Sequence, residues 1–340
     1  MDMRLKKQFM QIVALAAIVT AGSFAHAAGT DALKSARDTR QMMGTFVEIT
    51  VYDADEGKAK AALEAGFAEI ARVESVMSRF DPKSELSRLN RSGEKIFKCS
   101  DELFMLLEES RRYSELSGGA FDVTVGPLMK VWRDAGKEKK KPAPSAVEEA
   151  RSRVGYKKIR LDPAAKTARF MVPGMEADLG AIAKGYGADR AAAAIRAAGA
   201  KSALVNSGGD IRAVGKKMNS KPWTIALQNP RDKKQYLLKL AISDIGVTTS
   251  GDYEQYFVTG GRRYSHIINP KTGTSETGCM SATVIAPTAM QADALSTTIC
   301  SMEPGAGLRL IGKLGGVEAA IVGMDRRIRR SHGFSKYETE

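Results

Sequence analysis

The chain has 340 residues, of which 43% are hydrophobic, 6% aromatic and 27% charged, and its formal net charge is +13. This length fits one large domain or two small ones, and the lack of an internal repeat or a second long apolar segment excludes repeat arrays and a membrane-spanning body. The basic balance would suit nucleic acid, an anionic membrane or phosphorylated ligands, but a solvated basic surface is the simpler interpretation.

The N-terminus has the pattern of a secretory signal peptide. Basic residues precede a short apolar run and then small residues at the two positions that a signal peptidase reads: Arg4, Lys6 and Lys7, residues 10–21, and Ala25-His26-Ala27. The run is too short for a membrane anchor, because spanning a bilayer takes ~20 residues. We therefore expect a cleaved signal peptide over residues 1–27 and a mature chain beginning near Ala28. Export argues against nucleic acid as a partner.

The first predicted elements are a strand and two helices. Residues 43–52 alternate and are rich in β-forming residues, which predicts a strand. Apolar residues recur at helical spacing over 58–78, and a second helix is predicted from about Ser100 to Gly118-Gly119. Residues 80–90 between these helices are polar with an early proline, which indicates a loop or a short helix.

The middle of the chain carries fewer signals. The basic residues 137–141 are predicted to lie in an exposed loop. Residues 142–168 are an insertion or a linker by composition, although the sequence gives no firm domain boundary. A third helix is predicted to open at Gly180 and to stop at Gly199.

The second half is predicted to be rich in antiparallel strands. Alternation and glycine turns predict the strands 202–206, one from Ile211, 223–228, 237–242, the hairpin 253–258 and 262–268 around Gly260-Gly261, and 283–286. Thr288 and Gln291 form a capping box for a last helix. This mixture predicts an α+β fold and excludes a doubly wound parallel sheet.

Three cysteines are present: Cys99, Cys279 and Cys300. None has the spacing of metal ligands, and in an oxidising compartment one disulfide could form in three alternative pairings. Cys300 lies at helical spacing behind Leu295 and Ile299, which favours a small buried residue over a disulfide framework.

Four segments could carry chemistry, and the first two contain glycines. Asp178 precedes a glycine-bearing helix start with Lys184 one turn in, a suitable place for phosphate because helix N-termini offer free N–H groups. An ordinary N-cap with Lys184 in solvent explains the same pattern. The second segment, residues 206–210, is Asn-Ser-Gly-Gly-Asp, which indicates either a tight turn or a ligand lying against the backbone.

The other two segments offer oxygen donors and an imidazole. Asp293 and Thr297 lie one helical turn apart, and a carboxylate and a hydroxyl are donors that magnesium prefers, although by spacing alone a solvent-facing pair is the commoner explanation. His266 is the one histidine in a structured central region, where it could act as a general base or simply pack in a strand. Residues 248–253 could line the same cleft.

The order of eight segments is more specific than any one of them. They are MGT (43–45), FDPKSELSRLN (80–90), GGAFDVTVGPL (118–128), DLGAIAKGYGAD (178–189), NSGGD (206–210), TSGDYE (249–254), SHIINPKTG (265–273) and ADALSTT (292–298). This series resembles the ApbE family, the FAD:protein FMN transferases, over about residues 40–312. The resemblance implies a single domain over 28–340, with mixed, largely antiparallel sheets, packed helices and an FAD cleft between two lobes.

The resemblance also assigns roles to residues by position. It implies that FAD is contacted by Met43, Phe80, Ala120, Phe121, Asp122, Asp178 and Lys184. It implies that Mg²⁺ is held by the carbonyl of Ala181 and by the side chains of Asp293 and Thr297. His266 matches the proposed base, and Asp293 is counted with it as catalytic.

The implied reaction is magnesium-dependent transfer of FMN from FAD to a Thr or Ser hydroxyl of an acceptor flavoprotein, with release of AMP. The acceptor is expected to be another exported or membrane-bound chain, because Ser281-Ala282-Thr283 lacks the glycine of a target motif. FAD hydrolysis to FMN and AMP, or FAD storage without turnover, remain alternatives.

Three departures from the family pattern stand out. Asn269 replaces a frequent Asp, which puts a proton-relay role there in doubt, and Ser207 replaces a commoner Leu. No cysteine follows the apolar run to carry a lipid, so a soluble periplasmic form is expected.

Overall fold

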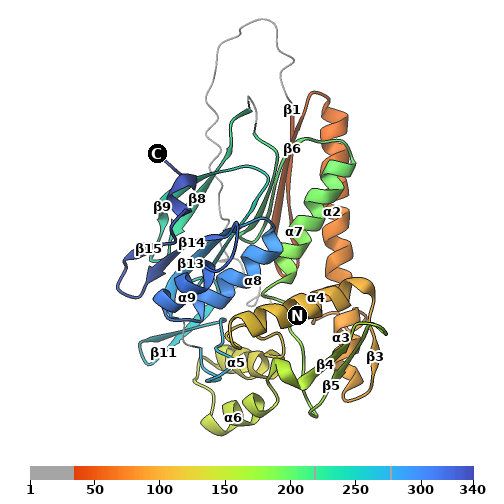
Figure 1. The fold of residues 1–340 in the computed structure, drawn as a ribbon, viewed down its shortest axis with the longest axis vertical. Helices are drawn as coiled ribbons and strands as arrows, with labels where there is room; N and C mark the ends of the chain where they lie inside the picture. Colours follow the sequence, from red (N-terminus) through yellow and green to blue (C-terminus); the bar gives the residue numbers. More distant parts are fainter. Residues whose placement is uncertain (1–33, 218–219, 276–277) are drawn as a thin grey trace, which may run out of the picture.

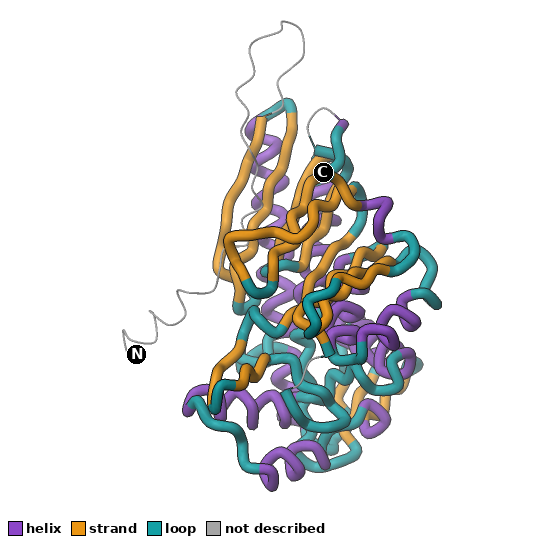
Figure 2. Tube along the Cα trace, turned by 90° about the vertical axis from the view of Figure 1, so that its left-hand side faces the viewer, coloured by secondary structure: helices purple, strands orange, loops and turns teal. Residues whose placement is uncertain are grey.

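The computed structural model describes residues 34–217, 220–275 and 278–340, so the predicted signal peptide and Ala28 lie outside the described residues. An upper part built on a long sheet stands above a lower part made chiefly of helices (Figure 1). A second view shows the same division, with the strands concentrated above (Figure 2). None of the helices in the described ranges has the length and apolarity to cross a lipid bilayer.

The upper part is organised by an eight-stranded sheet in the order β1-β2-β6-β7-β10-β13-β14-β15. Every neighbouring pair is antiparallel, as the sequence predicts. The strands are β1 (Lys34–Met42), β2 (Thr45–Asp53), β6 (Ser202–Ser207), β7 (Asp210–Val214), β10 (Gly246–Gly251), β13 (Cys279–Ala286), β14 (Glu318–Gly323) and β15 (Ile328–Arg330).

Helices cover one face of this sheet (Figure 1). They are α2 (Glu56–Met77), α7 (Ala183–Ala197) and α8 (Ala289–Cys300), followed by the shorter α9 (Pro304–Ile311). Leu63, Phe67 and Ile70 recur at helical spacing on α2 and pack with Ile49 of β2 and Ile195 of α7 in one buried cluster. The apolar stripe of α2 thus faces the sheet, as its periodicity predicts.

A small sheet in the order β16-β9-β8 covers the other face. Its strands are β8 (Trp223–Asn229), β9 (Asp232–Ile242) and β16 (Glu338–Thr339), with the 3₁₀ turn η3 (Phe334–Tyr337) beside them. Trp223 and Ile225 alternate along β8 and point into a cluster with Leu204 and Ile211 of the central sheet. The central sheet is therefore buried on both faces.

The lower part contains four helices among the described residues, together with short strands. The helices are α3 (Glu85–Ser92), α4 (Asp101–Leu116), α5 (Gly126–Glu138) and α6 (Pro144–Ser152). A three-stranded sheet contains β3 (Phe97–Lys98), β5 (Thr167–Phe170) and β4 (Ile159–Asp162), and the 3₁₀ turn η1 (Tyr156–Lys158) precedes β4. The strands β11 (Tyr256–Thr259) and β12 (Arg262–Ser265) form a hairpin. Leu103 of α4 shares one hydrophobic cluster with Val284 of β13 and Leu295 of α8, so both parts share a core.

Local chemistry accounts for the differences from the predicted elements. Helix α7 begins at Ala183 and not at Gly180, because residues 178–182 form a turn in which the Asp178 carboxylate accepts the Gly180 N–H at 2.9 Å. Strand β1 was not predicted, because its sequence KSARDTRQM is mostly polar and its buried side is a single residue, Ala36. Residues 142–168 form α6, η1, β4 and part of β5 in place of a linker. Residues 137–141 are exposed as expected, but Lys137 and Glu138 are the last residues of α5 and not part of a loop.

Candidate functional site

The central contact of the candidate site lies between the start of α7 and helix α8. A Cβ atom at Gly185 would lie 2.3 Å from the Ala289 carbonyl oxygen, so only glycine permits this approach. The Asp293 carboxylate on α8 accepts the Gly185 N–H at 3.0 Å. Because Ile182 at the N-cap of α7 makes no side-chain cap bond, Asp293 supplies the missing partner for an amide at this helix end.

Lys184 links Asp293 to a second buried carboxylate. Its ammonium contacts the Asp210 carboxylate and lies 3.7 Å from Asp293 Oδ1. Asp210 follows the Gly208-Gly209 turn, so the turn interpretation of that segment is confirmed, but sequence reasoning missed the partner of Lys184. The Lys184 side chain is 29% accessible, so it borders solvent but is not free in it.

The two buried carboxylates of Asp210 and Asp293 carry more charge than the single ammonium of Lys184. Asp210 and Asp293 are each 1% exposed. Burial, followed by repulsion from Asp210, raises the pKa of Asp293 to about 7. Glu254 lies near the same charges but is exposed to water. The site therefore holds more negative charge than Lys184 neutralises.

Thr297 lies one turn after Asp293 on α8. Its Oγ1 is 3.2 Å from Ser250 Oγ on β10, which is also 2.8 Å from Ser296 Oγ. Ser250 of the 248–253 segment thus lies beside Thr297, and a cleft shared by this segment and His266 stays a prediction. Since Asp293 is buried, the alternative of a solvent-facing Asp and Thr pair is wrong.

The donors present here fit a hard cation. Within residues 34–217, 220–275 and 278–340, no three His, Cys, Asp or Glu side chains form a metal cluster. A metal would therefore depend on Asp293, the Thr297 hydroxyl and backbone oxygens. Among these oxygens is the Ala181 carbonyl, two residues before the first residue of α7. Oxygen donors beside surplus buried negative charge suit Mg²⁺, which keeps several of its positions for water or phosphate.

Asp178 is held by a cation that sequence reasoning missed. Its Oδ2 lies 2.5 Å from Arg79 Nη1, and its N–H donates to the Val123 carbonyl at 2.7 Å. The Cζ atom of Arg79 lies 4.6 Å from the centroid of the Phe80 ring, and that of Arg133 lies 5.7 Å from the same centroid. The Phe80 ring is 72% exposed and borders a hollow of about 220 Å³, where a flat ligand ring could stack.

Asp122 already has several hydrogen-bond partners in the protein. One of its oxygens accepts from the Thr124 N–H and hydroxyl at 2.8 and 2.7 Å, and the other accepts from the Tyr156 N–H at 2.7 Å. Burial raises its pKa. Phe121 is buried against Tyr113, which leaves the half-buried Ala120 as the accessible member of the Ala120–Asp122 segment. A ligand role for Phe121 or Asp122 stays a prediction.

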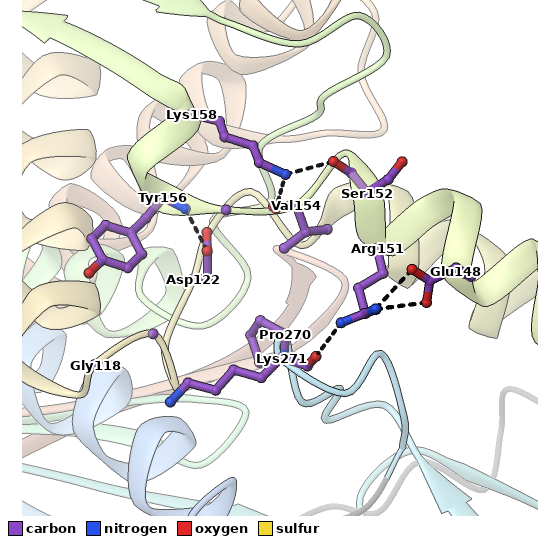
Figure 3. Close-up of a pocket in the computed structure, with 12 residues that line it drawn as sticks. Gly118, Asp122, Glu148, Arg151, Ser152, Val154, Tyr156, Lys158, Pro270 and Lys271 are labelled. Carbon is purple, nitrogen blue, oxygen red and sulfur yellow. Dashed lines mark hydrogen bonds and ion pairs between the residues drawn. The ribbon is translucent and has the colours of Figure 1, made fainter.

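A hollow of about 470 Å³ lies beside this segment (Figure 3). Gly118, Gly119 and Asp122 line it, and Figure 3 shows the Lys271 side chain extending toward Gly118 from the turn that follows His266. Neither Asp293 nor His266 lines this hollow. It therefore adjoins the candidate site without containing the metal donors.

Met43 lies against the first turns of α7. It occupies the β1–β2 turn with a positive φ of 52°, which is uncommon outside glycine. A Cβ atom at Gly187 would lie 3.0 Å from Met43 Sδ, so the thioether lies one turn beyond Lys184. The structure thus places Met43 near the other predicted residues.

His266 follows β12 directly. Its Nδ1 lies 3.3 Å from the Gln255 carbonyl oxygen, and its backbone N–H donates to the same oxygen at 2.9 Å. Burial lowers the pKa of His266 to about 4, with a smaller contribution in the same direction from Lys184, while the hydrogen bond with Gln255 and the charge of Asp178 oppose the shift. The imidazole is therefore neutral at pH 7, close enough to Lys184 and Asp178 to feel their charge, and only half-buried. A purely packed strand residue does not fit these surroundings.

Comparison with known proteins yields consistent matches. Residues 43–321 match the ApbE family. The FAD:protein FMN transferase of Haemophilus influenzae is 36% identical over 269 residues, covering 75% of this chain and 77% of that protein. The FAD:protein FMN transferase of Treponema pallidum is 33% identical over 309 residues, covering 86% and 85%. The crystal structure of the ApbE protein from Thermotoga maritima superposes with a TM-score of 0.82 at 32% identity, covering 90% of this chain and 100% of that chain.

Gly185→Ala tests the contact between α7 and α8. The added methyl group would overlap the Ala289 carbonyl, and overpacking costs about 1–3 kcal/mol. We expect the melting temperature to fall by roughly 2–10 °C. Gly315→Ala is the matched control, because its Cβ would meet open space. Equal melting temperatures for the two variants would contradict the close contact.

Proposed function

The chain belongs to the ApbE family, and on this premise we propose that it transfers the FMN half of FAD to a hydroxyl side chain of another protein. The observation that supports this most is the gathering of Asp178, Lys184, His266 and Asp293 at one place. They come from three separate stretches of chain. Their charges and proton-accepting groups are those that transfer from a diphosphate requires.

The diphosphate of FAD would lie at the start of α7. Free N–H groups at a helix N-terminus and the Lys184 ammonium bind phosphate oxygens. The surplus negative charge of Asp210 and Asp293 would repel an anion, so a cation is needed beside it. Mg²⁺ held by Asp293, Thr297 and the Ala181 carbonyl would neutralise the charge that develops on the phosphate oxygens.

The flavin and adenine ends of FAD need flat apolar surfaces. Phe80, with Arg79 beside its ring, offers one such surface, and the Met43 side chain offers a further apolar contact. The Arg79 and Asp178 pair would hold this part of the site in place, because each side chain fixes the other. We therefore assign Arg79 to FAD binding together with the residues that the sequence predicts.

His266 would act as the general base. Its neutral imidazole accepts the proton of a Thr or Ser hydroxyl on the acceptor. The hydroxyl oxygen then attacks the FMN phosphorus, the bond from that phosphorus to the bridging oxygen breaks, and AMP leaves. The acceptor ends with FMN joined through a phosphoester.

Asn269 has a structural role in this scheme. Its Oδ1 accepts the Lys271 N–H at 2.9 Å and so closes the turn after His266. An Asp carboxylate would accept the same bond, so the turn does not depend on the Asp frequent in the family. No proton relay through Asn269 is needed.

We also propose that the enzyme works in the periplasm on exported or membrane-bound acceptors. The support is the signal-peptide pattern over residues 1–27. The lack of a cysteine after the apolar run favours a soluble form over a lipoprotein.

The reaction is tested with purified enzyme, FAD, Mg²⁺ and an acceptor that carries a Ser/Asp-Gly-x-Thr stretch. We expect the intact mass of the acceptor to rise by one FMN group, with one AMP released per modified acceptor. Omission of Mg²⁺ should abolish both changes. AMP formed without any gain in acceptor mass would overturn the proposal in favour of FAD hydrolysis.

Asp293→Asn tests the metal site. The amide keeps an oxygen for the Gly185 N–H but loses the charge that attracts a cation. We expect FMN transfer to fall at least ~100-fold at equal Mg²⁺, with the circular dichroism spectrum unchanged. The control is Asp101→Asn, since Asp101 is an exposed partner of Lys166 and should be dispensable. Transfer at the normal rate by Asp293→Asn would refute the assignment.

His266→Ala separates a base from a binding residue. Loss of a general base slows the chemical step by roughly 100-fold or more, while the dissociation constant of FAD should change little. Single-turnover transfer and FAD fluorescence titration measure the two quantities. If the variant loses FAD binding instead, His266 is a ligand contact.

A further inference from the structure

Two cysteines, one at the start of β13 and one at the end of α8, lie in direct contact. The Sγ atoms of Cys279 and Cys300 are 3.1 Å apart, and both residues are 0% exposed. Cys279 is the first residue of β13, and Cys300 is the last residue of α8. Asp293 and Thr297 lie between them in the sequence.

The backbones around these two cysteines are fixed against each other. The Gly278 N–H donates to the Cys300 carbonyl at 2.9 Å. A Cβ atom at Gly278 would lie 1.8 Å from the Met302 carbonyl oxygen, so the chain before β13 touches the chain after α8. The sulfur atoms need to approach by about 1 Å to reach the bonded distance of ~2.0 Å, which side-chain rotation can supply.

We propose that Cys279 and Cys300 form a disulfide that fastens the C-terminal end of α8 to the start of β13. Of the three pairings that the sequence allows, the contact selects this one. Cys99 follows β3 directly, where its Sγ faces the Phe97 carbonyl oxygen at 3.9 Å, and under this proposal it keeps its free thiol.

The bond forms before the core closes. In the folded chain the hydrogen bond from Cys279, and then burial, raise the pKa of the Cys300 thiol, which keeps it protonated and unreactive. During folding, one cysteine thiolate attacks the disulfide of a small-molecule or protein oxidant, and a mixed disulfide forms. The second thiolate then displaces the oxidant, which leaves as two thiols. The chain loses two protons and two electrons, and the oxidant gains them.

The cross-link would stabilise the helix that carries Asp293 and Thr297. A disulfide restricts the unfolded chain and resists separation of the elements that it joins. Helix α8 would therefore stay on the sheet at temperatures where the reduced chain opens. This proposal is independent of flavin transfer, and its failure would leave the proposed function intact.

The test uses reduced full-length protein, unfolded in guanidinium and refolded with oxidised and reduced glutathione. We expect one free thiol per chain on alkylation under denaturing conditions. Peptide mapping without reductant should show the peptides of Cys279 and Cys300 joined, with a mass 2 Da below their sum. The Cys99→Ala variant should show the same joined peptides and no free thiol.

The stabilising effect is measured by melting with and without a phosphine reductant, after the bond has been opened in denaturant and the protein refolded. We expect reduction to lower the melting temperature by several degrees for the unaltered chain and for Cys99→Ala. The Cys279→Ala/Cys300→Ala double variant should be insensitive to reductant. Three free thiols, a bond that includes Cys99, glutathione attached in place of the cross-link, or equal melting temperatures for the oxidised and reduced forms would each overturn the proposal.

Discussion

The close approach of α7 to α8 at Gly185 is the constraint on which the candidate site depends. Without a side chain at Gly185, the Asp293 carboxylate reaches the amide at the start of α7. The same contact places the adjacent Lys184 between Asp293 and Asp210. Because Gly185 has no side chain, the Lys184 ammonium, the two buried carboxylates and the N-terminus of α7 all lie at one place.

The surplus of buried negative charge explains how this arrangement could favour both metal and nucleotide. Asp210 and Asp293 repel each other, and Lys184 offsets only part of their charge. A divalent cation would relieve that repulsion and at the same time attract a diphosphate. His266 remains neutral at pH 7 because the protein around it disfavours the imidazolium, so one ring nitrogen is free to accept a proton, as a weaker base than an exposed imidazole.

Patterns of neighbouring residues predicted helices and strands better than they predicted the side-chain contacts of the candidate site. Helical periodicity gave α2, and Thr288 does cap α8, because both depend on residues close in sequence. The pairing of Arg79 with Asp178 joins residues far apart in the chain, and no spacing rule signals it. Asp210 lay in a recognised Gly-Gly turn, but only the fold shows that its carboxylate meets Lys184. The order of the motifs indicated the family, since order survives where single motifs are ambiguous.

The hydrophobic cluster shared by the upper and lower parts restricts how a large substrate gains entry. Separating the two parts would break the contacts among Leu103, Val284 and Leu295 and expose their apolar surfaces to water. This exposure costs a free energy of about 25 cal/mol for each Å² of apolar surface. Hinged opening of the kind used by two-lobed binding proteins is therefore costly here. Entry of a dinucleotide would then depend on local features, such as the exposed Phe80 ring beside the smaller hollow.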